Sequence, residues 1–209
     1  MTYAPRLFLI ILGLSVFLSG CLIEKAPAPI SSARSRPVAL GFGMHVTANA
    51  KDNPIDPPER FDGYHSGLDY EVTASELDQE IPISAICSGS VLYSGFAEGY
   101  GGVLTQRCVI NKESVTVIYG HLDPDGLAPE GNVLAAGDRL GKLAAARSFW
   151  SDQNRKHLHL GIHRGEDSDM RGYVQAPMEL EEFIDPAVVL SRGARGREVS
   201  VYRVPEAKK

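Results

Sequence analysis

The segment HLHLGIH, His157 to His163, alternates polar or small residues with aliphatic ones in a period of two. A β-strand points successive side chains to opposite faces, so the segment predicts a strand with one aliphatic face and one imidazole face. Leu158, Leu160 and Ile162 would then contribute to a core. Histidine seldom fills a core unpaired, so the other face predicts either a polar site or a solvated surface. A chain built around such a strand must fold as a sheet buried on at least one side.

Short β-type runs occupy much of the chain between Ile81 and Val117. EGYGG and NKES separate them as turn sequences, and 21 glycines and 13 prolines are spread along the chain. Near the end, IDPAVVL offers Asp185 as a helix cap and Pro186 at the first helical position. We predict an all-β fold, a single domain of antiparallel sheets with a short C-terminal helix. The net charge of -5 argues against a nucleic-acid partner.

The N-terminus has the pattern of an export signal. Arg6 precedes an apolar run, Leu7 to Leu18, that is too short to span a membrane comfortably. LSGC then resembles the lipobox of bacterial lipoproteins, which implies cleavage before Cys21 and acylation of that residue. Because Leu22 is not an acidic retention residue, we expect a cell-envelope protein, lipid-anchored in the outer membrane and facing the periplasm. An ordinary secretory signal is the alternative, and absence of fatty-acid label from the mature protein would establish it.

Composition divides the chain into four parts. Residues 1–20 are the predicted signal peptide, and residues 21–37, rich in Pro, Ala and Ser, are the lipidated cysteine and a flexible tether. Residues 38–191 form the predicted domain. Residues 192–209 are a basic tail in which REVSVYRV could form an edge strand.

Two cysteines remain after the lipidated one. Cys87 and Cys108 lie in successive strand-like segments, and in an oxidising compartment such a pair predicts a disulfide. The bridge would stabilise the fold by about 3 kcal/mol by restricting the unfolded chain. Two buried free thiols are the alternative.

Histidines and one aspartate suggest a metal site. His65 and Asp69 are four residues apart, which places them on one face of an extended strand. His157 and His159 share a strand face, and His121 ends the apolar run VTVIYG. Imidazole and carboxylate are good zinc ligands, although each pair alone is also explained by an ordinary polar surface.

Taken together, HSGLD at His65, YGHL at His121 and HLH at His157 resemble the motifs of the lysostaphin/LytM-type zinc metallopeptidases, which cleave peptides of bacterial peptidoglycan. GNVLAAGDRLGKL and the closing IDPAVVL are also similar to segments of that family. The resemblance covers about residues 41–190. It implies the duplicated hybrid motif fold and a zinc endopeptidase acting on peptidoglycan peptide cross-links.

The resemblance assigns His65, Asp69 and His159 to zinc, and His121 and His157 to catalysis. Three protein ligands leave a fourth position for water, whose pKa zinc lowers. One imidazole would accept the proton of the water, and the other would stabilise the oxyanion or the leaving amine. The sequence does not decide which does which. The implied partners are peptidoglycan peptides and, through the anchor, a membrane; no protein regulator is identified.

Two segments depart from the family pattern. AAARSFWSDQNRK, before the last motif, lacks the usual glycine-rich Ser-Thr-Gly approach, and VTASELDQEIPI is expanded after the first motif. Both can reshape the substrate groove. Two other functions remain open: a non-catalytic LytM-type module that binds or activates a cell-wall amidase, and a metal-carrying lipoprotein. Replacement of His121 separates them, because only an enzyme would lose turnover while keeping zinc.

Overall fold

The computed structural model describes residues 26–167, 169–190 and 202–205 of the chain. Short strands dominate it, and the helical segments are brief. The strands are β1 (His45–Val46), β2 (Ile55–Asp56), β3 (Gly63–His65), β4 (Gly67–Glu71), β5 (Pro82–Ser84), β6 (Gly89–Ala97), β7 (Gly101–Ile110), β8 (Glu113–Gly120), β9 (Val133–Leu134), β10 (Arg139–Lys142), β11 (His157–Arg164), β12 (Tyr173–Val174) and β13 (Tyr202–Arg203). The helices are α1 (Pro186–Leu190) and the 3-10 turns η1 (Ala74–Glu76), η2 (Phe149–Ser151) and η3 (Pro177–Glu182).

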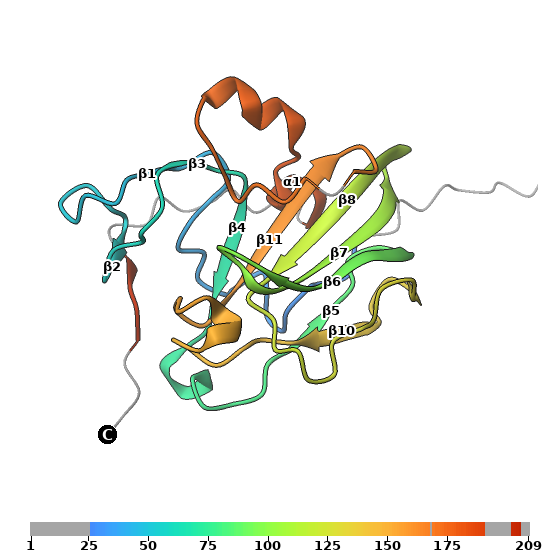
Figure 1. Ribbon diagram of the computed structural model, residues 1–209, viewed down its shortest axis with the longest axis horizontal. Helices are drawn as coiled ribbons and strands as arrows, with labels where there is room; N and C mark the ends of the chain where they lie inside the picture. Colours follow the sequence, from blue (N-terminus) through green and yellow to red (C-terminus); the bar gives the residue numbers. More distant parts are fainter. Residues whose placement is uncertain (1–25, 168, 191–201, 206–209) are drawn as a thin grey trace, which may run out of the picture.

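The main layer is a six-stranded antiparallel sheet in the order β4-β11-β8-β7-β6-β9 (Figure 1). Strand β11 lies between β4 and β8 and so brings the first and last predicted motifs side by side. A three-stranded sheet, β1-β3-β12, and the pair β5-β10 complete the domain. The predicted all-β class, with antiparallel sheets and a short C-terminal helix, is confirmed. The pair β2-β13 differs, because its strands run parallel.

The β7–β8 hairpin turns at Asn111 and Lys112, within the NKES turn sequence. Both residues have positive φ, 52° and 72°, as a two-residue turn matched to the strand twist requires. The turn sets the register of the two long central strands, in which Val103 lies opposite Gly120. It therefore fixes the position of the chain that leaves β8 at His121.

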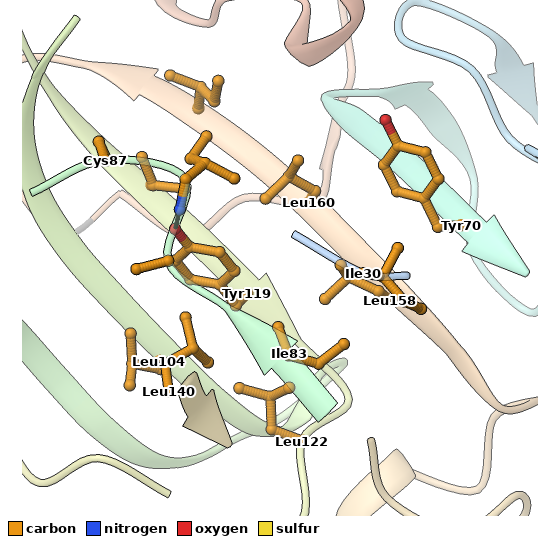
Figure 2. Packing of buried hydrophobic residues seen from close by; sticks show 14 of the residues in the cluster. Ile30, Tyr70, Ile83, Cys87, Leu104, Tyr119, Leu122, Leu140, Leu158 and Leu160 are labelled. Carbon is orange, nitrogen blue, oxygen red and sulfur yellow. Dashed lines mark hydrogen bonds between the residues drawn. The ribbon is translucent and has the colours of Figure 1, made fainter. Parts of the chain in front are cut away.

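The core lies between the six-stranded sheet and the β5-β10 pair (Figures 1 and 2). Leu158, Leu160 and Ile162 are fully buried in it, which confirms the aliphatic face predicted for β11. The hydroxyl of Tyr119 lies in this core (Figure 2), where it donates to Gln106 at 3.2 Å and accepts from the amide of Ile86 at 2.9 Å. Pairing of buried polar groups in this way avoids their desolvation cost.

A disulfide joins Cys87 to Cys108, with Cα atoms 6.1 Å apart. Cys108 lies on β7 opposite Gly89, the first residue of β6. The bridge links the β6–β7 hairpin to the segment that leads out of β5. Both sulfur-bearing residues belong to the core cluster.

The predicted tether is wrong for its second half. Ile30 is 2% exposed, packs into the main core and bridges to Ile83 of β5. The guanidinium of Arg36 donates hydrogen bonds to both carboxylate oxygens of Glu76, at 2.7 and 2.8 Å. The Pro, Ala and Ser content indicated a linker, but one isoleucine and one arginine with distant partners fix this segment. The packed structure therefore starts before residue 38.

We expect the Arg36–Glu76 pair to contribute stability that acid removes. Hydrogen bonds from Arg36 lower the pKa of Glu76 to about 2, below the value of about 4.5 expected when it is unfolded. A depressed carboxyl pKa stabilises the fold above the unfolded pKa, and the benefit is lost as pH falls through the folded one. Glu76→Gln should lower the free energy of unfolding by about 1–2 kcal/mol at pH 7. Urea titrations should show the difference from wild type shrinking between pH 4.5 and 2; a constant difference would contradict the pairing.

Other predictions lie at or beyond the ends of the described structure. The signal peptide 1–20 and Cys21 are outside the described residues, as is most of the basic tail. Within REVSVYRV, residues Tyr202–Arg203 form β13 and pair with β2, so part of the expected edge strand is present. Of the helices in the described ranges, none is long and apolar enough to cross a bilayer.

Candidate metal centre

Register across three strands assembles the site. His159 of β11 lies opposite Asp69 of β4 on one side and Gly120 of β8 on the other. His121 follows Gly120 directly, so it emerges beside the same point. His65 ends β3, and the chain breaks its strand geometry at Ser66 before β4 begins. The predicted single extended strand is thus two short strands in different sheets, but both side chains still reach one site.

Three donor atoms form a nearly equilateral triangle. Nε2 of His65 lies 3.0 Å from Nδ1 of His159 and 3.2 Å from Oδ1 of Asp69, and the remaining side is 3.1 Å. Around a tetrahedral zinc ion with ligands at about 2.0–2.1 Å, ligand atoms lie about 3.3 Å apart. The three side chains, each at most 4% exposed, therefore fit the two-histidine, one-carboxylate set of a catalytic zinc site.

Contacts behind the triangle orient the donors. Nδ1 of His65 lies 3.3 Å from the carbonyl oxygen of Gly41, which favours a proton on Nδ1 and leaves the lone pair on Nε2 facing the centre. Burial alone would raise the pKa of Asp69, but the neighbouring His65 and His157 outweigh it and hold that pKa well below its usual range. A lone pair and an ionised carboxylate converging in a buried space are suited to a cation.

Gly67 lets His159 approach the backbone of β4. A Cβ at Gly67 would lie 2.7 Å from Cε1 of the His159 ring and 2.6 Å from the carbonyl oxygen of Leu160. Neither atom can yield easily, because one belongs to a candidate ligand and the other to a strand ladder. The glycine in HSGLD is therefore required by close packing against the site.

We expect Gly67→Ala to weaken zinc binding by about 10- to 100-fold, the range seen when groups that orient a ligand are altered. The added methyl group must push the His159 ring away from the other donors. Competition with a chromogenic chelator measures the affinity. Gly41→Ala is the control, because its Cβ would meet only Met44 at 3.5 Å, an ordinary contact. Equal zinc affinity in the two variants would show that β4 moves aside without displacing His159.

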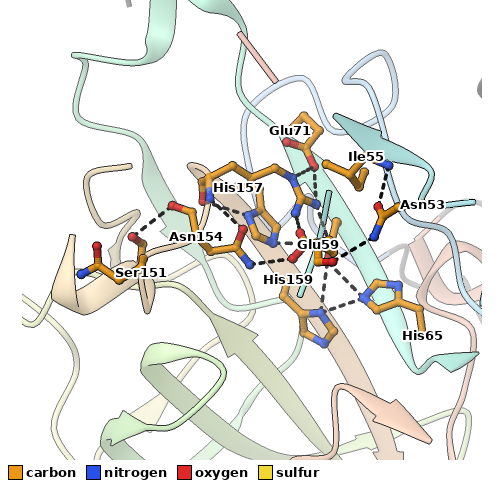
Figure 3. Close-up of polar contacts among 12 residues, drawn as sticks. Asn53, Ile55, Glu59, His65, Glu71, Ser151, Asn154, His157 and His159 are labelled. Atoms are coloured by element: carbon orange, nitrogen blue, oxygen red, sulfur yellow. Dashed lines mark hydrogen bonds and ion pairs between the residues drawn. The ribbon is translucent and has the colours of Figure 1, made fainter. Parts of the chain in front are cut away.

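His121 and His157, the two histidines predicted to act in catalysis, face each other beside the triangle, with ring centroids 4.2 Å apart. Nε2 of His157 is 3.4 Å from Oδ2 of Asp69, and Nδ1 lies 3.0 Å from the carbonyl oxygen of Arg155. Burial lowers the pKa of His157 to about 4, and that of His121 well below its usual range. Both imidazoles are therefore neutral at pH 7. Figure 3 shows His65, His157 and His159 converging on one space.

A cleft of about 290 Å³ opens onto these side chains. Asp69, His121, His157 and His159 lie at its base. The remaining lining residues form the walls and mouth: Phe61, Asp62, Glu98, Gly99, Tyr100, Asn154, Gly172, Tyr173 and Gln175. Aromatic and amide walls over a histidine base can bind a peptide backbone.

The structure brings all five predicted site residues together and leaves the other histidines apart. His163 continues the same face of β11, where its Nδ1 lies 2.8 Å from Asp167 rather than near the triangle. His45 packs edge-on against Tyr64. Trp150 packs edge-on against Phe96, with ring centroids 5.9 Å apart.

Sequence reasoning missed three groups around the site. Tyr100 places its hydroxyl 3.4 Å from Nε2 of His159, and the ring of Tyr173 lies tilted against that of His65 with centroids 5.2 Å apart. Arg155 places Nη2 2.7 Å from Oδ2 of Asp69. The EGYGG turn places Tyr100 directly before β7, whose first residues lie beside the site, where Val103 is opposite Gly120. Nothing in QNRK distinguishes Arg155 from a solvated charge.

Solved structures of other proteins have similar folds. A chain of the SpoIIQ–SpoIIIAH pore-forming complex superposes with a TM-score of 0.52 at 14% identity, covering 81% of this chain and 93% of that one. LytU superposes with a TM-score of 0.50 at 22% identity, covering 73% and 83%. Csd3 of Helicobacter pylori gives 0.45 at 17% identity, and this chain spans only 35% of its length. At these identities the SpoIIQ–SpoIIIAH chain and LytU, with TM-scores of 0.52 and 0.50, speak for the fold alone.

Family membership comes from the sequence. None of the curated proteins compared with the chain matches it significantly. The model of peptidase family M23 matches residues 63–170, a range that begins just before His65 and ends beyond His159. The match covers half of the chain and contains every residue of the histidine–aspartate triangle. The chain therefore belongs to peptidase family M23 and has the LytM-type peptidase fold.

Proposed function

We propose that the protein is a zinc-dependent endopeptidase that hydrolyses amide bonds in peptidoglycan peptide cross-links. The observation that carries the proposal is the triangle of His65, Asp69 and His159, with sides of 3.0–3.2 Å. Asp69 and His159 line a cleft together with His121 and His157. Membership of family M23 supports the reaction class and the cell-wall substrate.

Zinc bound at the triangle would supply Lewis acidity to a water molecule and to the scissile carbonyl. His157 is placed to accept a proton from that water. Nδ1 lies 3.0 Å from the carbonyl oxygen of Arg155, which favours a proton on Nδ1 and leaves the lone pair on Nε2. A neutral imidazole with a lone pair beside the donors of a metal site has the geometry of a general base.

His121 is placed to stabilise charge on the substrate. Its Nδ1 is buried and has no hydrogen-bond partner among the described residues. His121 itself follows β8 directly and has a φ of 62°. This backbone conformation turns its ring toward His157 rather than along the strand. Burial raises the pKa of Tyr100, so its hydroxyl stays protonated and adds a second donor in the same cleft. Donors preorganised in a buried site are effective at a developing oxyanion.

The proposed place of action is the cell envelope, with the domain held near peptidoglycan through acylated Cys21. That residue and the preceding apolar run lie outside the described structure, so this part rests on the lipobox pattern alone. A Cys21→Ser protein that still takes up labelled fatty acid would remove the anchor from the proposal.

The test combines metal content with hydrolysis. Purified protein should contain about one zinc per chain by mass spectrometry and should release new amino groups from purified peptidoglycan. Removal of zinc by a chelator should abolish the release, and added zinc should restore it. A folded protein that holds zinc but releases no amino groups from peptidoglycan or isolated muropeptides would leave the alternative, a non-catalytic module acting on an amidase.

A further inference from the structure

Arg155 is the most deeply buried cation beside the candidate site. It lies two residues before His157, and its side chain is 1% exposed. Its guanidinium is paired with three carboxylates from two separate segments, those of Glu59, Asp69 and Glu71. The contacts to Asp69 and Glu71 measure 2.7 and 2.9 Å.

The two oxygens of Asp69 have different partners. Oδ1 faces the other two donors, Nε2 of His65 at 3.2 Å and Nδ1 of His159 at 3.1 Å. Oδ2 points the other way and accepts a hydrogen bond from Nη2 of Arg155 at 2.7 Å. Nε2 of His157 lies 3.4 Å from the same oxygen. A carboxylate held by a guanidinium on one oxygen can offer only the other to a metal.

Arg155 is itself fixed from behind. Nε donates to Glu71, while Nη1 pairs with Glu59, a residue of the segment between β2 and β3. The side chains of Glu59 and Glu71 are only 4% and 1% exposed, so these contacts are shielded from water. A lysine could not replace this arrangement, because its ammonium is a single point of charge and the guanidinium fork serves three acceptors.

We propose that Arg155 is a positioning residue for Asp69 that holds the carboxylate as a one-oxygen metal ligand and so preserves an open coordination position for water. The proposal rests on the proposed zinc site. It also gives a role to the charged segment QNRK directly before His157, where the family pattern has a glycine-rich segment. Arg155 touches neither metal nor substrate and acts through Asp69.

The test uses cobalt(II) in place of zinc, because the intensity of its visible absorption falls as its coordination number rises. Arg155→Met should weaken cobalt binding by about 10- to 100-fold and lower the absorption per bound ion. The weaker binding follows from loss of the group that orients Asp69, and the lower absorption follows from release of Oδ2 to the metal. Arg155→Lys should restore only part of the cobalt affinity and part of the absorption per bound ion. The control is Arg36→Met, which also removes a buried arginine from a carboxylate pair, at a distance from the site, and should leave both readouts unchanged.

The outcomes separate the two proposals. If wild-type protein binds neither zinc nor cobalt, the proposed function fails and this inference with it. If wild type binds cobalt and Arg155→Met matches its affinity and spectrum, Arg155 only supports the fold and this inference alone is overturned. Should Arg155→Met not fold, the same test uses Arg155→Lys and Glu59→Gln. Glu59→Gln keeps the guanidinium of Arg155 but weakens one of the contacts that hold it. Unchanged spectra in both would also overturn the inference.

Discussion

The His159→Ala protein should contain no stoichiometric zinc, and its peptidoglycan hydrolysis should fall to the background rate. Nδ1 of His159 forms two sides of the donor triangle, at 3.0 Å from His65 and 3.1 Å from Asp69. Its removal leaves two protein ligands, and catalytic zinc sites use three. We expect zinc affinity to fall by more than about 100-fold, which exceeds the effect of altering a group that only orients a ligand. Mass spectrometry of the purified protein and titration with zinc measure the loss.

His163→Ala provides a matched control. His163 is also a buried histidine on the polar face of β11, four residues further along, but it contacts Asp167 and not the triangle. Both variants remove one imidazole from the same strand, so a general loss of stability would affect both. Full zinc content and turnover in His163→Ala, with neither in His159→Ala, would locate the metal. A His159→Ala protein that retains equimolar zinc would place the ion elsewhere and end the proposed mechanism.

Local pattern was enough to predict the strand that carries these residues. The period of two in HLHLGIH placed Leu158, Leu160 and Ile162 in the core and the histidines on the opposite face, as the structure has them. The NKES turn was equally readable, because Asn111 tolerates the positive φ that a tight hairpin needs. Signals of this kind extend over a few residues and depend little on the rest of the chain.

Partners distant in sequence were not predictable. Arg36 binds Glu76, 40 residues away, and without that pairing residues 26–37 read as a linker. Arg155 is buried only because Glu59, Asp69 and Glu71 surround it, and these lie 84 or more residues earlier in the chain. A charged residue in a polar stretch is usually solvated, so sequence alone favours the wrong environment. Long-range electrostatic pairing therefore set the limit of the prediction at both places.

The His121→Ala protein should keep its zinc and lose most of its turnover. His121 is outside the donor triangle, and its ring lies against His157 at 4.2 Å between centroids. Loss of one positioned proton donor or acceptor costs about 10²- to 10⁴-fold in rate. We therefore expect kcat on a cross-linked muropeptide to fall by at least about 100-fold, with zinc affinity within a few-fold of wild type. Release of amino groups and chelator competition measure the two quantities on the same preparation.

This variant also separates the three functions that the sequence left open. An endopeptidase loses turnover, an amidase-activating module keeps its stimulation of the partner, and a metal carrier keeps both zinc affinity and zinc release. His45→Ala serves as the control, because His45 lies outside the cleft against Tyr64 and should change nothing. Hydrolysis by His121→Ala at the wild-type rate would remove His121 from the chemistry and leave His157 as the sole imidazole able to act. Zinc lost together with turnover would instead mean that His121 supports the metal, although His121 is not among the three residues whose donor atoms converge.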